Sequence, residues 1–126
     1  MPQKILLVDD DENILFLFGL ALEENGYNVQ TASTGAEALT LVEAMNFDII
    51  LLDYKLSDQD GISLAKEIHK IKEVKIIVVT GTRDKVKSQD KYKSISKVLV
   101  KPVSEETLVS EIHTVLNQEF RETEVI

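Results

Sequence analysis

Polar and charged side chains stand directly after short apolar runs at four places in the sequence. They are Asp9-Asp10-Asp11 after Ile5–Val8, Asp53 after Ile49–Leu52, Thr80-Gly81 after Ile76–Val79 and Lys101-Pro102 after Val98–Val100. A charge at the end of a buried apolar run is unfavourable unless it is paired or does chemistry. These residues are therefore the first candidates for a functional site.

The carboxylates among them predict a metal site. Neighbouring carboxylates in a partly dry pocket repel one another, which raises their pKa values and destabilises the fold unless a cation neutralises them. Neither histidine is near these residues in the sequence, and the chain contains no cysteine. Hard oxygen ligands without such neighbours favour Mg²⁺, with Mn²⁺ as its substitute. We expect Asp10, with help from Asp9, to hold this ion.

A divalent ion beside a carboxylate, an ammonium group and a hydroxyl makes a site for a phosphoryl group. Phosphoryl transfer mainly needs positioning and neutralisation of charge on the phosphoryl oxygens. Asp53 is then the nucleophile, because a carboxylate that attacks phosphorus forms an acyl phosphate. Lys101 would pair with one phosphoryl oxygen, and the Thr80 hydroxyl would donate a hydrogen bond to another.

The apolar runs themselves predict buried strands. Each of the four contains no more than four residues and is apolar throughout, which is typical of strands covered on both faces of a sheet. A fifth run, Tyr27–Thr31, alternates between polar and apolar residues and is predicted to be an edge strand.

Helical patterns separate the strands. In residues 13–24, Ile14, Leu17, Phe18 and Ala21 are predicted to pack on the sheet, and Gly26 follows at the position of a C-terminal cap. The sequence 34–37 is a capping box that opens a helix, and Ser104 is predicted to cap the last one. The apolar stripes of the other helices are Ala38, Leu41, Val42 and Met45; Leu64, Ala65, Ile68 and Ile71; and Leu108, Ile112, Val115 and Leu116. Residues 82–93 predict a shorter, solvated helix.

This strict alternation of strands and helices predicts an α/β fold. Right-handed crossovers would produce a parallel sheet with helices on both faces. Ligands of such doubly wound sheets bind beyond the carboxyl ends of the strands. The four groups of polar residues are therefore expected to meet at one edge of the sheet.

Length, charge and composition limit the class of protein. The 126 residues suit one domain, with a core at about 3–118 and a polar tail at 119–126. A net charge of −8, from 22 acidic and 14 basic residues, argues against direct binding to nucleic acid. The absence of cysteine excludes disulfides and agrees with a reducing compartment. The N-terminus has too short an apolar run for a signal peptide or membrane span, so we expect a cytoplasmic protein.

The motifs VDDD, LLDYKLSDQDG, VVTG and VLVKP, in this order, resemble those of the receiver domain of two-component response regulators. The resemblance covers essentially residues 3–118. It implies a single-domain, flavodoxin-like (βα)5 fold whose five parallel strands have the order 2-1-3-4-5. The chain would then be a signalling switch that takes part in its own phosphotransfer and dephosphorylation, and not a turnover enzyme.

The resemblance also assigns roles to individual residues. Asp53 becomes the phosphorylation site, Asp9 and Asp10 the acidic pair, Thr80 the switch hydroxyl and Lys101 the phosphate partner. It adds the backbone carbonyl of Lys55 as a metal ligand and implies a cis peptide bond at Lys101-Pro102.

The resemblance also implies partners. The phosphoryl donor would be a sensor histidine kinase or a histidine phosphotransfer protein, and the target a downstream protein or effector domain. The chain would be either a stand-alone regulator or the receiver of a longer protein. Output would use the face made by the fourth helix, fifth strand and fifth helix, to which the lysines at 85, 87, 91 and 93 would contribute.

Two positions depart from the family pattern. Ser57 stands where receivers usually have proline, which would loosen the loop that ends at Asp60-Gly61. Val98 stands where they commonly have tyrosine or phenylalanine. A readout that depends on the rotamer of that aromatic ring cannot operate with valine.

Three other classes of protein fit these residues less well. A phosphate-ester hydrolase of the haloacid-dehalogenase type needs a second aspartate two residues after the nucleophile, and Lys55 is there instead. A flavodoxin-like electron carrier needs aromatic rings around its flavin, but aromatic residues make up 6% of the chain and none is tryptophan. A receiver-like scaffold that is never phosphorylated would not need the complete set of carboxylates, hydroxyl and lysine. His69 and His113 have no ligand partner at a recognisable spacing and are expected at surface or boundary positions.

Overall fold

The computed structural model describes residues 2–81 and 94–118. The strands are β1 (Lys4–Val8), β2 (Asn28–Ala32), β3 (Ile49–Asp53), β4 (Lys75–Thr80) and β5 (Lys97–Val100). The helices are α1 (Glu12–Glu24), α2 (Gly35–Ala44), α3 (Gly61–Ile71) and α4 (Glu105–Leu116). The helix predicted at residues 82–93, with its lysines, and the tail at 119–126 lie outside the described residues.

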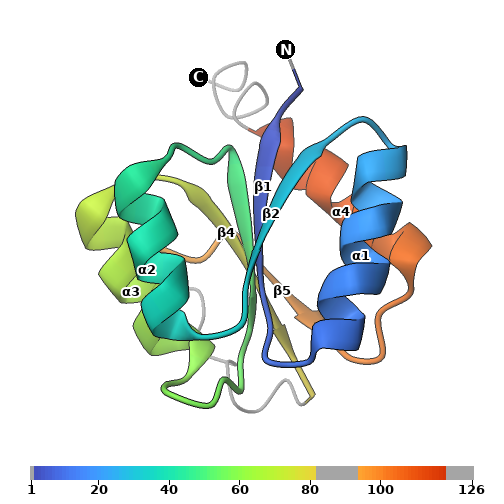
Figure 1. The fold of residues 1–126 in the computed structure, drawn as a ribbon. Helices are drawn as coiled ribbons and strands as arrows, with labels where there is room; N and C mark the ends of the chain where they lie inside the picture. The colour runs from blue at the N-terminus through green and yellow to red at the C-terminus, as the bar shows by residue number, and fades with distance from the viewer. Residues whose placement is uncertain (1, 82–93, 119–126) are drawn as a thin grey trace.

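The strands form one parallel sheet in the order β2-β1-β3-β4-β5, which confirms the predicted flavodoxin-like architecture. β3 is buried along its whole length, and β1 and β4 are buried except at their first residues. β2 lies at one edge and is partly exposed, as its alternating sequence predicted. The carboxyl ends of the strands point to the bottom of Figure 1.

Two pairs of helices cover the sheet, α2 with α3 on one face and α1 with α4 on the other (Figure 1). Side chains alternate between these layers along each strand. In β3, Ile50 and Leu52 belong to the core cluster beneath α2 and α3, whereas Ile49 and Leu51 belong to the cluster beneath α1 and α4. The continuous apolar runs are therefore explained by burial on both sides.

Side-chain caps begin the helices at the positions that the sequence predicted. Thr34 Oγ1 accepts a hydrogen bond from the Glu37 N–H at 3.1 Å, and the Glu37 carboxylate accepts one from the Ser33 N–H at 2.9 Å. Ser104 caps α4 by accepting from the Thr107 N–H at 3.0 Å. Gly26 follows the end of α1 with a φ of 90°, a conformation that glycine adopts without steric penalty.

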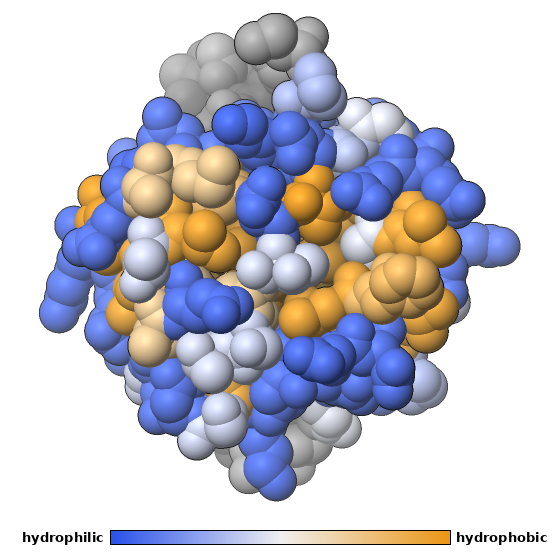
Figure 2. Space-filling model, viewed as in Figure 1, coloured by the Kyte–Doolittle hydropathy of each residue, from blue (hydrophilic) through white to orange (hydrophobic). Residues whose placement is uncertain are grey.

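The buried face of α1 differs from the prediction. Leu15 and Leu22 are buried with Ala21, whereas Leu17, which was expected to face the sheet, is 46% exposed. Phe16 is 68% exposed, and Figure 2 shows apolar surface over α1 on the right of the molecule. Because nearly every residue of α1 between Ile14 and Leu22 is apolar, helical spacing alone fits more than one face.

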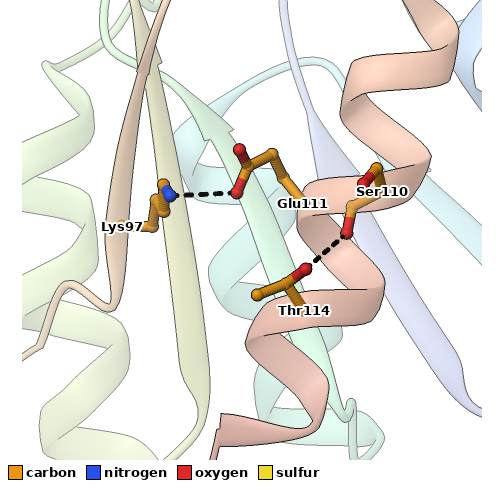
Figure 3. A network of polar contacts seen from close by, with 4 residues as sticks. All are labelled: Lys97, Ser110, Glu111 and Thr114. Carbon is orange, nitrogen blue, oxygen red and sulfur yellow. Dashed lines mark hydrogen bonds and ion pairs between the residues drawn. The ribbon is translucent and has the colours of Figure 1, made fainter.

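Two lysines fasten α4 to the sheet. Lys97 of β5 forms an ion pair with Glu111 at 3.0 Å, beside the hydrogen bond from Thr114 to the Ser110 carbonyl (Figure 3). Lys75 of β4 donates from Nζ to the carbonyls of Val115 and Leu116 at 2.8 and 2.9 Å. Carbonyl groups at a helix C-terminus lack partners within the helix, so the Lys75 ammonium caps α4.

Candidate functional site

The carboxylates of Asp9, Asp10 and Asp53 form a cluster at the carboxyl ends of β1 and β3. Each offers an oxygen, and these oxygens lie within 4.8 Å of one another. Asp53 and Asp9 are buried, with 7% and 8% of their surface exposed, whereas Asp10 is exposed. The strand register thus brings together residues that are more than 40 positions apart in the sequence.

Hydrogen bonds at the end of β1 separate the roles of the three consecutive aspartates. The Asp9 N–H donates to the Ala32 carbonyl at 3.1 Å and so continues the pairing with β2. Asp9 accepts a hydrogen bond from the Asp11 N–H at 2.9 Å, and Asp11 accepts one from the Asn13 N–H at 2.9 Å. Asp11 is therefore the N-cap of α1, whereas Asp9 and Asp10 belong to the carboxylate cluster.

Burial and negative charge disfavour ionisation of Asp9. Removal from water is the main cause that raises its pKa to about 6. The negative charges of Asp53 and Asp10 also raise this pKa, whereas the hydrogen bond from the Asp11 N–H and the positive charge of Lys101 lower it. A bound cation would reverse this effect, because positive charge favours the ionised carboxylate. The electrostatics therefore suit a divalent cation with oxygen ligands.

Lys101 completes the charged part of the site. Its Nζ lies 3.0 Å from Oδ1 of Asp53, and its backbone N–H donates to the Thr80 carbonyl at 2.8 Å. Burial opposes the charge on Lys101, but the hydrogen bond and charge of Asp53 outweigh it and raise the pKa of the ammonium group. The Lys101-Pro102 peptide bond is cis, as predicted.

Thr80 is buried at the end of β4 but on the other side of the sheet from Asp53. It follows the alternation of Val78, which packs beneath α2 and α3, whereas Asp53 follows Leu51, which packs beneath α1 and α4. Thr80 therefore lies at the same edge of the sheet as Asp53, but on the side covered by α2 and α3.

A cavity of about 580 Å³ opens at this edge. The polar part of its lining includes Asp9, Asp10, Asp53 and Lys101, and the apolar part includes Ile14, Leu15, Phe18 and Val103. Among the described residues, Gly81 also lines it but Thr80 does not. A few convergent charged groups in an otherwise apolar pocket are typical of a ligand site.

Lys55, whose backbone carbonyl was expected to bind the metal, is the second residue of the loop between β3 and α3. Its backbone forms an isolated antiparallel bridge with Asp60, and the Leu56 N–H donates to the Gln59 carbonyl at 3.3 Å. Asp60 then caps α3 by accepting from the Ser63 N–H at 2.8 Å.

Sequence reasoning did not assign a role to Asp58 or explain Gly61. The Asp58 carboxylate accepts hydrogen bonds from the N–H groups of Gly35 and Ala36 at 2.9 and 3.0 Å. Gly61 has no room for a side chain, because a Cβ there would lie 2.7 Å from the Asp53 carbonyl oxygen. The only sequence signal for either residue was the Asp-Gly pair at the end of the loop.

Ile71, which was predicted to belong to the apolar stripe of α3, is instead 39% exposed, because it is the last residue of the helix and lies beyond the buried Ile68. His69 is half-buried and His113 exposed. Val98 is buried in the cluster beneath α2 and α3. Within residues 2–81 and 94–118, no helix combines the length and hydropathy needed to cross a membrane.

The comparisons with known proteins agree with this geometry. A family model described as the response regulator receiver domain matches residues 5–113. The transcriptional regulatory protein GlrR of Escherichia coli (strain K12) is 34% identical over 121 residues, which are 93% of this chain and 27% of that protein. SrrA of Staphylococcus aureus (strain NCTC 8325 / PS 47), also a transcriptional regulatory protein, is 31% identical over 119 residues, 94% of this chain and 49% of that protein. The chain thus spans between about a quarter and a half of these relatives.

Solved structures with the same fold include a CheY-like receiver domain from Methanospirillum hungatei JF-1, with a TM-score of 0.87 and 33% identity over 97% of this chain and 99% of that one. Another is the response regulator TrrA from Thermotoga maritima in complex with Mg²⁺-BeF, with a TM-score of 0.80 and 32% identity over 90% of this chain and 98% of that one. Because the family model covers most of the sequence and relatives of 31% and 34% identity cover nearly all of it, the chain belongs to the family of response regulator receiver domains.

Proposed function

We propose that this receiver domain accepts a phosphoryl group on Asp53 and acts as a signalling switch. The observation that carries the proposal is the pairing of the buried Asp53 carboxylate with Lys101 Nζ at 3.0 Å, beside the carboxylates of Asp9 and Asp10. A nucleophilic oxygen, a cationic partner for the incoming group and a cluster of oxygen ligands for a divalent ion therefore lie in one cavity.

The donor would be a phosphohistidine of a sensor histidine kinase or a histidine phosphotransfer protein. A carboxylate oxygen of Asp53 attacks phosphorus, the P–N bond breaks, and its electron pair leaves with the imidazole, which regains a proton. The product is an aspartyl acyl phosphate. Lys101 turns from the carboxylate to a phosphoryl oxygen, so its ammonium group neutralises charge before and after transfer.

Asp9, Asp10 and Asp53, with the backbone carbonyl of Lys55, would hold Mg²⁺ or Mn²⁺. The donors are all oxygen atoms, and a cation would offset both the burial and the neighbouring negative charges that raise the pKa of Asp9. When bound, the ion supplies positive charge that neutralises the phosphoryl oxygens. The complex of the related TrrA with Mg²⁺-BeF supports this assignment.

Phosphorylation would change which proteins the domain binds. It adds about −1.5 to −2 charges at neutral pH, which would draw Thr80 and Lys101 toward the phosphoryl group and shift a conformational equilibrium. Thr80 comes from the layer of α2 and α3, so its movement would couple the site to the packing around Val98. That coupling would act through valine packing and not through an aromatic rotamer.

The test is incubation with acetyl phosphate and Mg²⁺, followed by intact-mass measurement. We expect a gain of one phosphoryl group that needs Mg²⁺ and is absent in Asp53→Asn. Asp48→Asn is the matched control, because Asp48 is an exposed aspartate that accepts a hydrogen bond from the Lys4 N–H near the start of β1. A wild-type protein without the gain, or an Asp53→Asn variant that retains it, would overturn the proposal.

A further inference from the structure

We propose that Asp58 is a positioning residue that holds the loop between β3 and α3 against α2, and so keeps the Lys55 carbonyl in place for a divalent ion. The inference rests on the proposed function of the site. Asp58 accepts two hydrogen bonds from the first N–H groups of α2, at 2.9 Å from Gly35 and 3.0 Å from Ala36. Both oxygens of the carboxylate are used, which fixes its orientation as well as its position.

Hydrogen bonds within the loop connect Asp58 to Lys55. It closes on itself through the Lys55–Asp60 bridge and the hydrogen bond from Leu56 to Gln59, and the Leu56 side chain is buried. At its far end the Gly61 N–H donates to the Tyr54 carbonyl at 2.6 Å. A displacement at Asp58 would therefore be transmitted to Lys55 through only a few backbone atoms.

A second contact places the loop directly on α2. The Gln59 side chain lies over Gly35, so closely that a Cβ on Gly35 would be 2.6 Å from Gln59 Nε2. The partial positive charge of the helix N-terminus adds to the attraction for the Asp58 carboxylate. Accordingly, the hydrogen bonds from Gly35 and Ala36 lower the pKa of Asp58, which keeps it ionised at neutral pH.

Ser57 makes these contacts more important. Proline at this position would fix one backbone torsion of the loop, whereas serine leaves it to be ordered by other interactions. The tie to α2 supplies such an interaction from outside the loop. Without it, the Lys55 carbonyl would have to be ordered when the ion binds, and this lost entropy would weaken binding.

The expected effect of Asp58→Ala is therefore on the affinity for Mg²⁺ and not on the chemical step. The dissociation constant for Mg²⁺ should rise about three- to tenfold. The phosphorylation rate at saturating Mg²⁺ should stay within about twofold of wild type, because Asp53 and Lys101 are unchanged. Asp58→Asn keeps one oxygen acceptor and should have an intermediate dissociation constant.

The test combines calorimetric titration of the full chain with MgCl₂ and the acetyl phosphate rate measured across Mg²⁺ concentrations. Asp48→Ala is the control, since it also removes an aspartate that accepts a backbone N–H from a distant segment, at 2.7 Å from Lys4 near the opposite end of the sheet. Melting temperatures without Mg²⁺ verify that each variant is folded. If Asp58→Ala does not fold, the titration of Asp58→Asn decides the question.

An unchanged dissociation constant in the folded Asp58 variants would overturn the inference, as would a weakening equal to that of Asp48→Ala. A fall in the limiting rate at constant affinity would also contradict it. Wild-type protein that binds Mg²⁺ but is not phosphorylated would overturn the proposed function alone, because the affinities of the variants would still test Asp58.

Discussion

The ammonium group of Lys101 lies 3.0 Å from Oδ1 of Asp53, and this ion pair spans the sheet from the end of β5 to the end of β3. β4 lies between those strands, and the Lys101 backbone N–H pairs with the Thr80 carbonyl at the end of β4, so the Lys101 side chain reaches across β4 to contact Asp53. Asp53 is buried and its partner is 43% exposed, which leaves Lys101 accessible from the cavity. A cation therefore lies beside the buried Asp53 carboxylate and remains accessible to a group that enters the cavity.

Lys101→Met should lower the rate of phosphoryl acceptance at least about tenfold, because the charge on the transferring oxygens loses its cationic partner. The rate is measured as mass gain with acetyl phosphate at saturating Mg²⁺. Lys97→Met is the matched control, since Lys97 also forms a carboxylate ion pair of 3.0 Å, with Glu111, but away from the cavity. Equal rates in the two variants would show that Lys101 has no special role.

Asp9→Asn should stabilise the metal-free protein at neutral pH. The pKa of Asp9 is raised from 3.8 to about 6, so the folded state holds its proton more tightly than the unfolded state does. The folded state therefore loses stability as the pH rises through this interval, and the loss is complete above it. The gain from asparagine should be about 1 to 3 kcal/mol at pH 7, toward the lower end where solvent screens the charge, and should vanish near pH 4.

Urea unfolding between pH 4 and pH 7, with EDTA present, measures this difference. Addition of Mg²⁺ should reverse the order at neutral pH, because the wild-type site gains binding energy that the variant largely lacks. A stability gain that is independent of pH would assign the effect to packing and not to the charge of Asp9.

Gly61→Ala should destabilise the protein by about 2 kcal/mol or more and impair phosphorylation. The added Cβ would lie 2.7 Å from the Asp53 carbonyl oxygen and 3.0 Å from Tyr54 Cα, so the backbone at the proposed phosphorylation site must shift. Gly19→Ala is the contrasting control within α1, where the nearest side-chain atoms lie 3.8 and 3.9 Å away. Alanine there should be neutral or stabilise by about 0.5 to 1 kcal/mol. Thermal unfolding and the acetyl phosphate assay measure both effects, and a harmless Gly61→Ala would contradict the close approach.

Lys75→Met should reduce stability by about 1 to 2 kcal/mol without a change in phosphorylation, because the carbonyls of Val115 and Leu116 lose their cationic donor. Urea unfolding measures the loss, and Lys70→Met, at an exposed position of α3, is the control for removal of a lysine. A loss no larger than that of the control would show that the cap does not stabilise α4.

The sequence was sufficient for the elements that depend on neighbouring residues. Runs such as Ile49–Leu52 predicted buried strands, and Thr34 and Ser104 predicted helix starts, because capping and strand patterning act over a few residues. The same locality explains the incorrect prediction for Leu17. Nearly all of α1 between Ile14 and Leu22 is apolar, so only packing against the sheet decides that Leu15 and Leu22 are the buried pair.

The site was predictable only as a set of residues at strand ends. The alternation of strands and helices implies parallel strands, whose carboxyl ends share one edge of the sheet. This edge is where Asp9, Asp53, Thr80 and Lys101 were expected. The order of the strands came from a family resemblance, since alternation alone does not determine it. The layer from which Thr80 approaches the site depended on how the side chains of β4 alternate in the folded sheet.

The contacts of Asp58 with α2 and of Gly61 with the Asp53 carbonyl were decided by tertiary structure alone. Asp58 and Gly35 are separated by 23 residues, and no periodic or capping signal connects them. Hydrophobic periodicity reports which side of an element is buried, but a hydrogen bond between a loop and a distant helix depends on strand register and helix packing, which only the complete fold determines.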